Sequence, residues 1–83
     1  MVSDGDYVAI FNSIHRVMKA EKVLKGRRLA ILLIPAPRPL SADCGLAIRY
    51  ASNDREAVEK VLQEERLLPE DIYVKRGEKY VKC

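Results

Sequence analysis

The segment that decides the fold runs from residue 29 to residue 50 and reads LAILLIPAPRPLSADCGLAIRY. It begins with the apolar run Leu29–Ile34 and ends with a second, shorter run, Leu46–Tyr50. Pro35, Pro37 and Pro39 follow the first run at alternate positions. Because proline fixes φ and has no backbone N–H, this part can be neither a helix interior nor a central strand. The segment therefore predicts two strands joined by a stiffened loop.

Upstream of this segment, the sequence indicates one further strand and a helix. Tyr7–Phe11 is almost wholly apolar, as expected of a strand in the middle of a sheet. Asn12-Ser13 is an N-cap signal, and apolar residues then recur at helical spacing over Ile14–Lys25, before a glycine. Glu21 falls within the apolar stripe of this helix. A carboxylate there needs a partner if it is buried, unless the helix is rotated so that it lies at the edge of the stripe.

Downstream, the pattern predicts a second helix and a fourth strand. Ser52-Asn53-Asp54 is a cap signal, with Glu56 at the spacing of a capping box, and it predicts a helix from about residue 54 to residue 66. Ile72–Val74 reads as the fourth strand. Residues 76–78 carry a turn signal, and residues 79–82 could form a short edge strand after it.

The order of elements is therefore β-α-β-β-α-β. We expect an α+β domain with the ferredoxin-like split β-α-β-β-α-β fold, a four-stranded antiparallel sheet and both helices on one face. A chain of 83 residues fits one domain, spanning 1–83. In this arrangement we expect the second and third strands at the two edges of the sheet, or beside them on opposite sides. The proline-rich connection would then cross one end of the molecule.

Composition excludes several classes of function. The net charge of +3 comes from 15 basic and 12 acidic residues spread along the chain, which does not favour a nucleic-acid partner. The longest apolar run is too short to span a membrane, and the N-terminal residues lack the features of a secretory signal. We therefore expect a cytoplasmic protein with no membrane partner, in which the two cysteines are more often reduced than bridged.

Cys44, at the end of the proline-rich loop, is the leading candidate for chemistry. The reactive form of a thiol is the thiolate, which nearby cations favour. Arg38 and Arg49 flank Cys44 in the sequence, and Gly45 leaves one side of it open. The alternative is that Cys44 is a small buried hydrophobic residue at the start of a strand. The residues alone leave both interpretations open.

Other residues offer weaker support. Ser41 and Asp43 are typical of turn chemistry that would hold the loop, although a nearby Asp43 would raise the thiol pKa. His15, at the start of the first helix, could activate a thiol, but a solvated histidine is the commoner case. Cys83 is the last residue, where chain ends tend to fray. One His and two Cys without a CxxC motif do not make a zinc set, so we expect no metal and no cofactor.

The sequence resembles the Se/S carrier protein-like family over about residues 7–74. Members of that family occur alone or as the C-terminal part of a selenium-metabolism protein that has an N-terminal sulfur-carrier domain. The residues that carry the resemblance are Ser13–His15, Ala20–Leu24, Ile34–Arg38 and Ser41–Arg49.

The resemblance implies a carrier whose Cys44 takes up a sulfane sulfur or selenium as a persulfide or perselenide and passes it to an acceptor. It implies a sulfurtransferase-like carrier and not a stand-alone enzyme. The residues that it implies around the thiol are Ser13, His15, Glu21, Pro37, Arg38, Ser41 and Gly45. The implied partners are a cysteine desulfurase-like donor and a sulfur-carrier domain, whose Cys-Pro-x-Pro motif this sequence lacks.

Two other classes of function remain open at this point. One is a non-catalytic regulatory or interaction module that binds through a sheet edge or through the loop, and such an edge would also allow a homodimer. The other is a thiol redox switch between Cys44 and Cys83.

Overall fold

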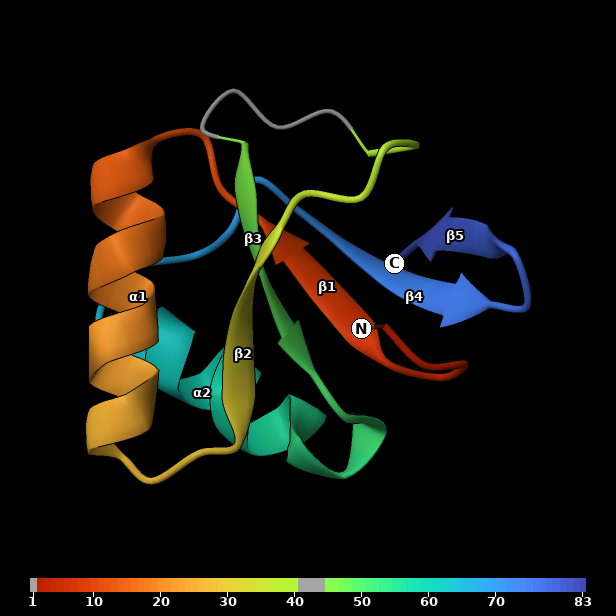
Figure 1. Ribbon diagram of the computed structural model, residues 1–83. Helices are drawn as coiled ribbons and strands as arrows, with labels where there is room; N and C mark the ends of the chain where they lie inside the picture. Colours follow the sequence, from red (N-terminus) through yellow and green to blue (C-terminus); the bar gives the residue numbers. More distant parts are fainter. Residues whose placement is uncertain (1, 41–44) are drawn as a thin grey trace.

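The computed structural model describes residues 2–40 and 45–83, and all the strands in this part of the chain belong to one antiparallel sheet (Figure 1). The sheet order is β2-β3-β1-β4-β5. Helices α1 and α2 pack on one face of it. The elements are β1 (Tyr7–Ile10), α1 (Ile14–Gly26), β2 (Ile31–Pro35), β3 (Leu46–Tyr50), α2 (Arg55–Glu64), β4 (Asp71–Arg76) and β5 (Lys79–Lys82).

The predicted α+β class is confirmed, and the possible edge strand at residues 79–82 is present, so the sheet has five strands and the predicted count of four was wrong. The C-terminal residues form a full fifth strand, which pairs with β4 from Arg76↔Lys79 to Tyr73↔Lys82. Gly77 has a φ of 63°, in the left-handed region that tight hairpin turns require. The side chain of Asp4 accepts a hydrogen bond of 2.6 Å from the Gly77 N–H. The turn is therefore held by its own glycine and by the N-terminal segment.

The expected separation of the second and third strands was also wrong. β2 and β3 are neighbours, in register from Ile31↔Tyr50 to Pro35↔Leu46. Pairing them satisfies the backbone polar groups of two apolar runs that would otherwise be buried without partners. The proline-rich loop therefore joins two paired antiparallel strands and does not cross the molecule between distant strands.

Pro35 belongs to β2 because of its place in the ladder. The N–H of Ala36 donates a hydrogen bond of 2.9 Å to the carbonyl of Gly45, so Ala36 and Gly45 form a hydrogen-bonded pair. Such pairs alternate along an antiparallel ladder. The position of Pro35 is therefore one whose backbone N–H would point away from β3, towards the outer edge of the sheet. Proline removes no ladder hydrogen bond there, and it leaves the edge a poorer template for another chain.

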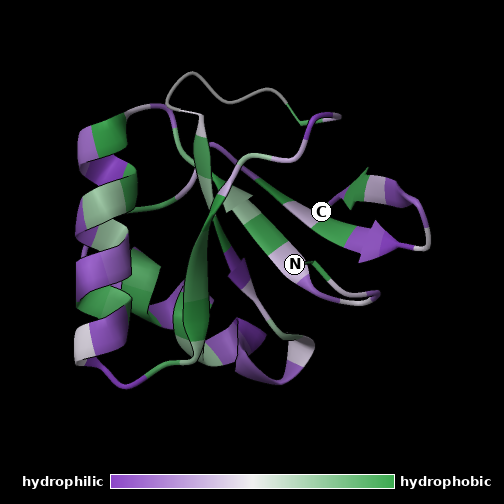
Figure 2. Ribbon diagram, viewed as in Figure 1, coloured by the Kyte–Doolittle hydropathy of each residue, from purple (hydrophilic) through white to green (hydrophobic). Residues whose placement is uncertain are grey.

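β1 is the centre of the fold, and all four of its residues are buried. The helix side of the sheet carries the larger cluster, in which Tyr50 is the largest fully buried side chain. The other side has its own smaller cluster, made of Val8, Ile10, Ile34, Leu40 and Ala47. Figure 2 shows hydrophobic residues along β2 and through the middle of the sheet, and hydrophilic residues over much of α1.

The two helices begin differently. Ser13 caps α1 as predicted, because its side chain accepts a hydrogen bond of 3.2 Å from the Arg16 N–H. The predicted capping box of the second helix is wrong. Ser52–Asp54 forms a short 3-10 turn, and Asp54, the residue before α2, makes no side-chain cap hydrogen bond.

A partly buried ion pair joins the start of β1 to the end of β3. Asp6 is 6% exposed, and its carboxylate lies 2.8 Å from Nε of Arg49 in β3. Burial alone would raise the pKa of Asp6, but hydrogen bonds from Arg49 and from the Ser3 N–H outweigh it and lower the pKa. Asp6 thus joins the N-terminal segment, β1 and β3 in its ionised form.

Asp6→Asn is expected to lower the free energy of unfolding at pH 7 by on the order of 2 kcal/mol, because Arg49 loses its carboxylate partner. A carboxyl group whose pKa is lowered by folding stabilises the protein above its unfolded pKa of about 3.9, and this contribution is lost as the pH falls below that value. The difference between wild type and variant, measured by urea unfolding, should therefore shrink between about pH 4 and pH 2.

Asp54→Asn is the control, since the Asp54 side chain makes no cap hydrogen bond. A difference for Asp6→Asn that stays constant from pH 7 to pH 2 would contradict the assignment of the stabilisation to the ionised carboxylate.

Candidate functional site

The stem of the proline-rich loop is tied by two backbone hydrogen bonds. The N–H of Ala36 donates to the carbonyl of Gly45, and the N–H of Leu40 donates to the carbonyl of Pro37, both over 2.9 Å. The second bond closes a four-residue turn, with the exposed side chains of Arg38 and Pro39 at its corner. The first half of the loop is therefore ordered by its own backbone.

Leu40 anchors this half of the loop to the protein. Its side chain is 7% exposed and packs in the cluster on the helix-free side of the sheet. Sequence reasoning missed this anchor. The available signal was an apolar residue directly after three alternating prolines, in a segment that otherwise reads as surface.

Gly45 defines the other end of the loop. It is exposed, with a φ of 72°, and apart from its chain neighbours no atom of the described residues lies within 4 Å of the position that a Cβ would occupy. Glycine is therefore favoured here by backbone conformation and not by lack of space. Ser41, Asp43 and Cys44 lie outside the described residues, between the fixed points Leu40 and Gly45, and their predicted roles stay predictions.

The first turn of α1 lies at the same end of the molecule as the two ends of the loop (Figure 1). Ser13 caps that turn, and His15 is exposed in it. No acidic residue is present in the turn, so the partial positive charge of the helix N-terminus is not offset by its own side chains. The structure thus brings Ser13 and His15 to the end of the molecule at which the loop begins and ends.

Two other predicted neighbours lie elsewhere. Glu21 lies about two helical turns further along α1, and its carboxylate is 3.1 Å from the ammonium of Lys25, one turn on. The side chain of Glu21 is 19% exposed, so it lies at the edge of the buried stripe. Arg49 is engaged with Asp6. The partner of Glu21 is therefore Lys25, and neither Arg38 nor Arg49.

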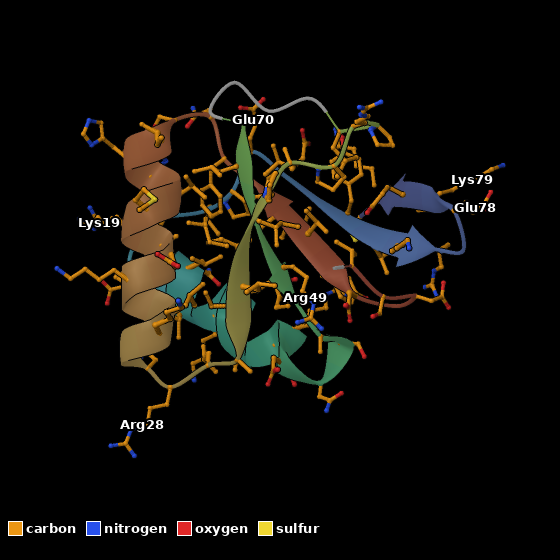
Figure 3. All side chains as sticks on the ribbon, in the orientation of Figure 1. Lys19, Arg28, Arg49, Glu70, Glu78 and Lys79 are labelled. Atoms are coloured by element: carbon orange, nitrogen blue, oxygen red, sulfur yellow. The ribbon has the colours of Figure 1, made fainter. Side chains whose placement is uncertain are left out.

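Glu70 is an acidic residue at this end that sequence reasoning did not single out. Its backbone N–H donates a hydrogen bond of 2.8 Å to the carbonyl of Ile10, the last residue of β1. Figure 3 labels Glu70 at the end of the molecule where the loop lies. A carboxylate close to a thiol raises the thiol pKa. Only the sheet order could have revealed this position.

Cys83 is an exposed free cysteine, and its N–H donates to the carbonyl of Ile72 in β4. The other member of the predicted redox pair, Cys44, lies outside the described residues, so the redox switch stays a prediction.

The described part of the chain, residues 2–40 and 45–83, holds no group of three or more His, Cys, Asp or Glu side chains placed to bind a metal ion. It also contains no helix that is long and apolar enough to cross a membrane.

The fold and the loop define a small α+β domain whose cysteine-containing segment is held between two anchored residues. Comparison with protein families identifies the family to which this domain belongs. A family model described as "Putative Se/S carrier protein-like" matches residues 6–74. The chain therefore belongs to the Se/S carrier protein-like family. No curated protein and no solved structure matched the chain.

Gly45→Ala is expected to lower the free energy of unfolding by about 1 kcal/mol, because alanine is strained at a positive φ. Gly26→Ala is the matched control. Gly26 also has open space at its Cβ position, but it ends α1 without a positive φ, so alanine should be neutral or stabilising by about 0.5 kcal/mol. Equal effects of the two substitutions in urea unfolding would show that backbone strain does not decide the choice of Gly45.

Proposed function

We propose that this protein is a sulfur or selenium carrier in which the Cys44 thiol holds the transferred atom. The observation that carries the proposal is the family match, which spans the whole proline-rich loop, including Cys44. The cysteine at the end of this loop, at residue 44, lies in the matched region, whereas Cys83 lies outside it.

The surroundings of the loop support this use. A carrier needs a thiol that a partner protein can reach and a charge environment that favours the thiolate. The exposed guanidinium of Arg38 and the N-terminal turn of α1 supply positive charge at this end, and Glu70 opposes them. The anchors at Leu40 and Gly45 fix where the segment leaves and rejoins the fold.

The chemistry requires no cofactor on this chain. The Cys44 thiolate attacks the terminal sulfur of a donor persulfide. A new S–S bond forms to Cys44, the donor S–S bond breaks, and its electron pair leaves on the donor thiolate. No external oxidant or reductant is needed, because the transfer exchanges one persulfide for another. A selenium atom would move by the same displacement, and an acceptor thiolate would repeat the step.

The donor in this proposal is a cysteine desulfurase-like protein and the acceptor is a protein with a sulfur-carrier domain. The proposal places the protein in the cytoplasm, where thiols stay reduced. We also propose that the fold is a ferredoxin-like split β-α-β-β-α-β arrangement extended by β5 at the edge of β4. The adjacent order β2-β3-β1-β4 and the shared helix face support this grouping.

The test is intact-mass spectrometry after incubation with a cysteine desulfurase and cysteine. Wild type should gain the mass of one sulfur atom, and dithiothreitol should remove it, as expected for a persulfide. Cys44→Ser should gain nothing, whereas Cys83→Ser should gain the same mass as wild type. A Cys44→Ser variant that accepts sulfur as well as wild type would rule the proposal out.

The pKa of the Cys44 thiol separates this function from a non-catalytic interaction module. It is measured from the rate of alkylation by iodoacetamide against pH in the Cys83→Ser background. A carrier predicts a pKa below about 8.5, the ordinary value for cysteine. Arg38→Ala should then slow alkylation at pH 7. Lys22→Ala, which removes another exposed charge from the middle of α1, should not. An ordinary pKa with slow alkylation would favour the module.

A further inference from the structure

A pocket of about 310 Å³ lies at the base of the proline-rich loop, on the helix-free side of the sheet. It is formed where three segments far apart in the sequence meet. Figure 1 shows the segment that follows β2 extending towards β5, away from the helices. The residues that line the pocket are Val2 from the N-terminal segment, Ile34, Pro35 and Pro37 from the end of β2 and the loop, and Lys75 and Tyr80 from the β4–β5 hairpin.

The walls of the pocket suit the apolar part of a small molecule. The side chains from β2 and the loop are apolar and come from a stretch that the ladder and the turn already hold in place. The volume is at the lower end of the range of about 300–1,000 Å³ found for small-molecule sites. A ligand of about the size of an amino acid fits this space.

The polar groups of the pocket stand together on one wall. Lys75 and Tyr80 are cross-strand partners in the hairpin, so their side chains lie on the same face of the sheet. The Lys75 ammonium donates one hydrogen bond of 3.1 Å, to the carbonyl of Val2. An ammonium has three donors, so two remain for a ligand. Among the residues described, none hydrogen-bonds the Tyr80 hydroxyl, which is therefore available as a second donor.

The charge of this wall is positive and is not balanced within the pocket. None of the described residues that line it is acidic. Asp6, the residue before β1, is already paired with Arg49 at 2.8 Å. A carboxylate ligand would complete the charge-assisted hydrogen bonds that the protein itself leaves unmade.

We propose that this pocket binds a small organic acid, with its carboxylate at Lys75 and Tyr80 and its apolar body against Pro35 and Pro37. Val2, Lys75 and Tyr80 lie outside residues 6–74, so the polar wall is not part of what the family match covers. The inference does not rest on the carrier function of Cys44. It adds a ligand site that shares Pro37 with the loop.

Benzoate is a suitable probe, because it is rigid and of the right size, and benzamide is its neutral counterpart. In a titration followed by ¹H–¹⁵N NMR, benzoate should shift the amide signals of Ile34, Lys75 and Tyr80 in a saturable way. The dissociation constant should be about 1–10 mM, as expected for a ligand of this size. Benzamide should bind at least about fivefold more weakly, because it lacks the charge.

Lys75→Met should weaken benzoate binding by about tenfold, and Tyr80→Phe, which removes only the hydroxyl, by about threefold. Lys79→Met is the matched control. This substitution removes the same charge from the same hairpin, but strand alternation places Lys79 on the opposite face of the sheet from Tyr80. The Lys79→Met variant should therefore bind benzoate like wild type. Figure 3 labels Lys79 near the hairpin turn.

The proposal fails if benzoate causes no saturable shifts of these signals at concentrations up to about 50 mM. It also fails if benzamide binds as tightly as benzoate, or if Lys79→Met weakens benzoate binding as much as Lys75→Met does. Cys44→Ser keeps the two proposals apart, because it should bind benzoate normally even though it cannot carry sulfur. Sulfur uptake by Cys44→Ser would overturn only the carrier function, and a failure of wild type to bind benzoate would overturn only the pocket proposal.

Discussion

The whole structure depends on the burial of β1. Its residues are apolar at consecutive positions, and a strand of this kind is stable only when both faces of the sheet are covered. α1 and α2 cover one face. They cannot cover the other, so the chain must supply a second layer from segments that have no regular structure of their own. Val2, Ala36 and Leu40 provide much of that layer, together with Tyr80 of β5.

This requirement links the core to the candidate site. The loop that leads to Cys44 is held against the sheet because Leu40 is needed to cover Val8 and Ile10. The prolines assist this placement, because they lower the conformational entropy that the loop loses when it is ordered against the sheet. A loop that completes the core has a fixed path at its base, and the same path forms one wall of the pocket beside Lys75.

The sequence predicted the elements better than their arrangement. The cap at Ser13, the end of α1 and the central place of β1 follow from local patterns, and all three are observed. Other features depend on which of several compatible partners a residue contacts in the folded protein. These are the pairing of β2 with β3, the contact of Glu21 with Lys25 and the anchor at Leu40. The pocket was beyond prediction, because residues 2, 37 and 80 meet only after the sheet has formed. Ser41 and Cys44 lie outside the described residues, and their roles stay predictions.

The central place of β1 also bears on how this protein is made. β1 precedes in the sequence both of the strands that pair with it, β3 on one side and β4 on the other, and the last residue of β4 is Arg76. The edge of β1 that faces β4 therefore has no strand partner until β4 has been synthesised. Folding is then expected to be a late, concerted event instead of a stepwise one, because both strands that pair with β1 lie far from it in the sequence. During synthesis, the apolar segments of both β1 and β2 are exposed, which is the interval in which a chaperone has something to bind.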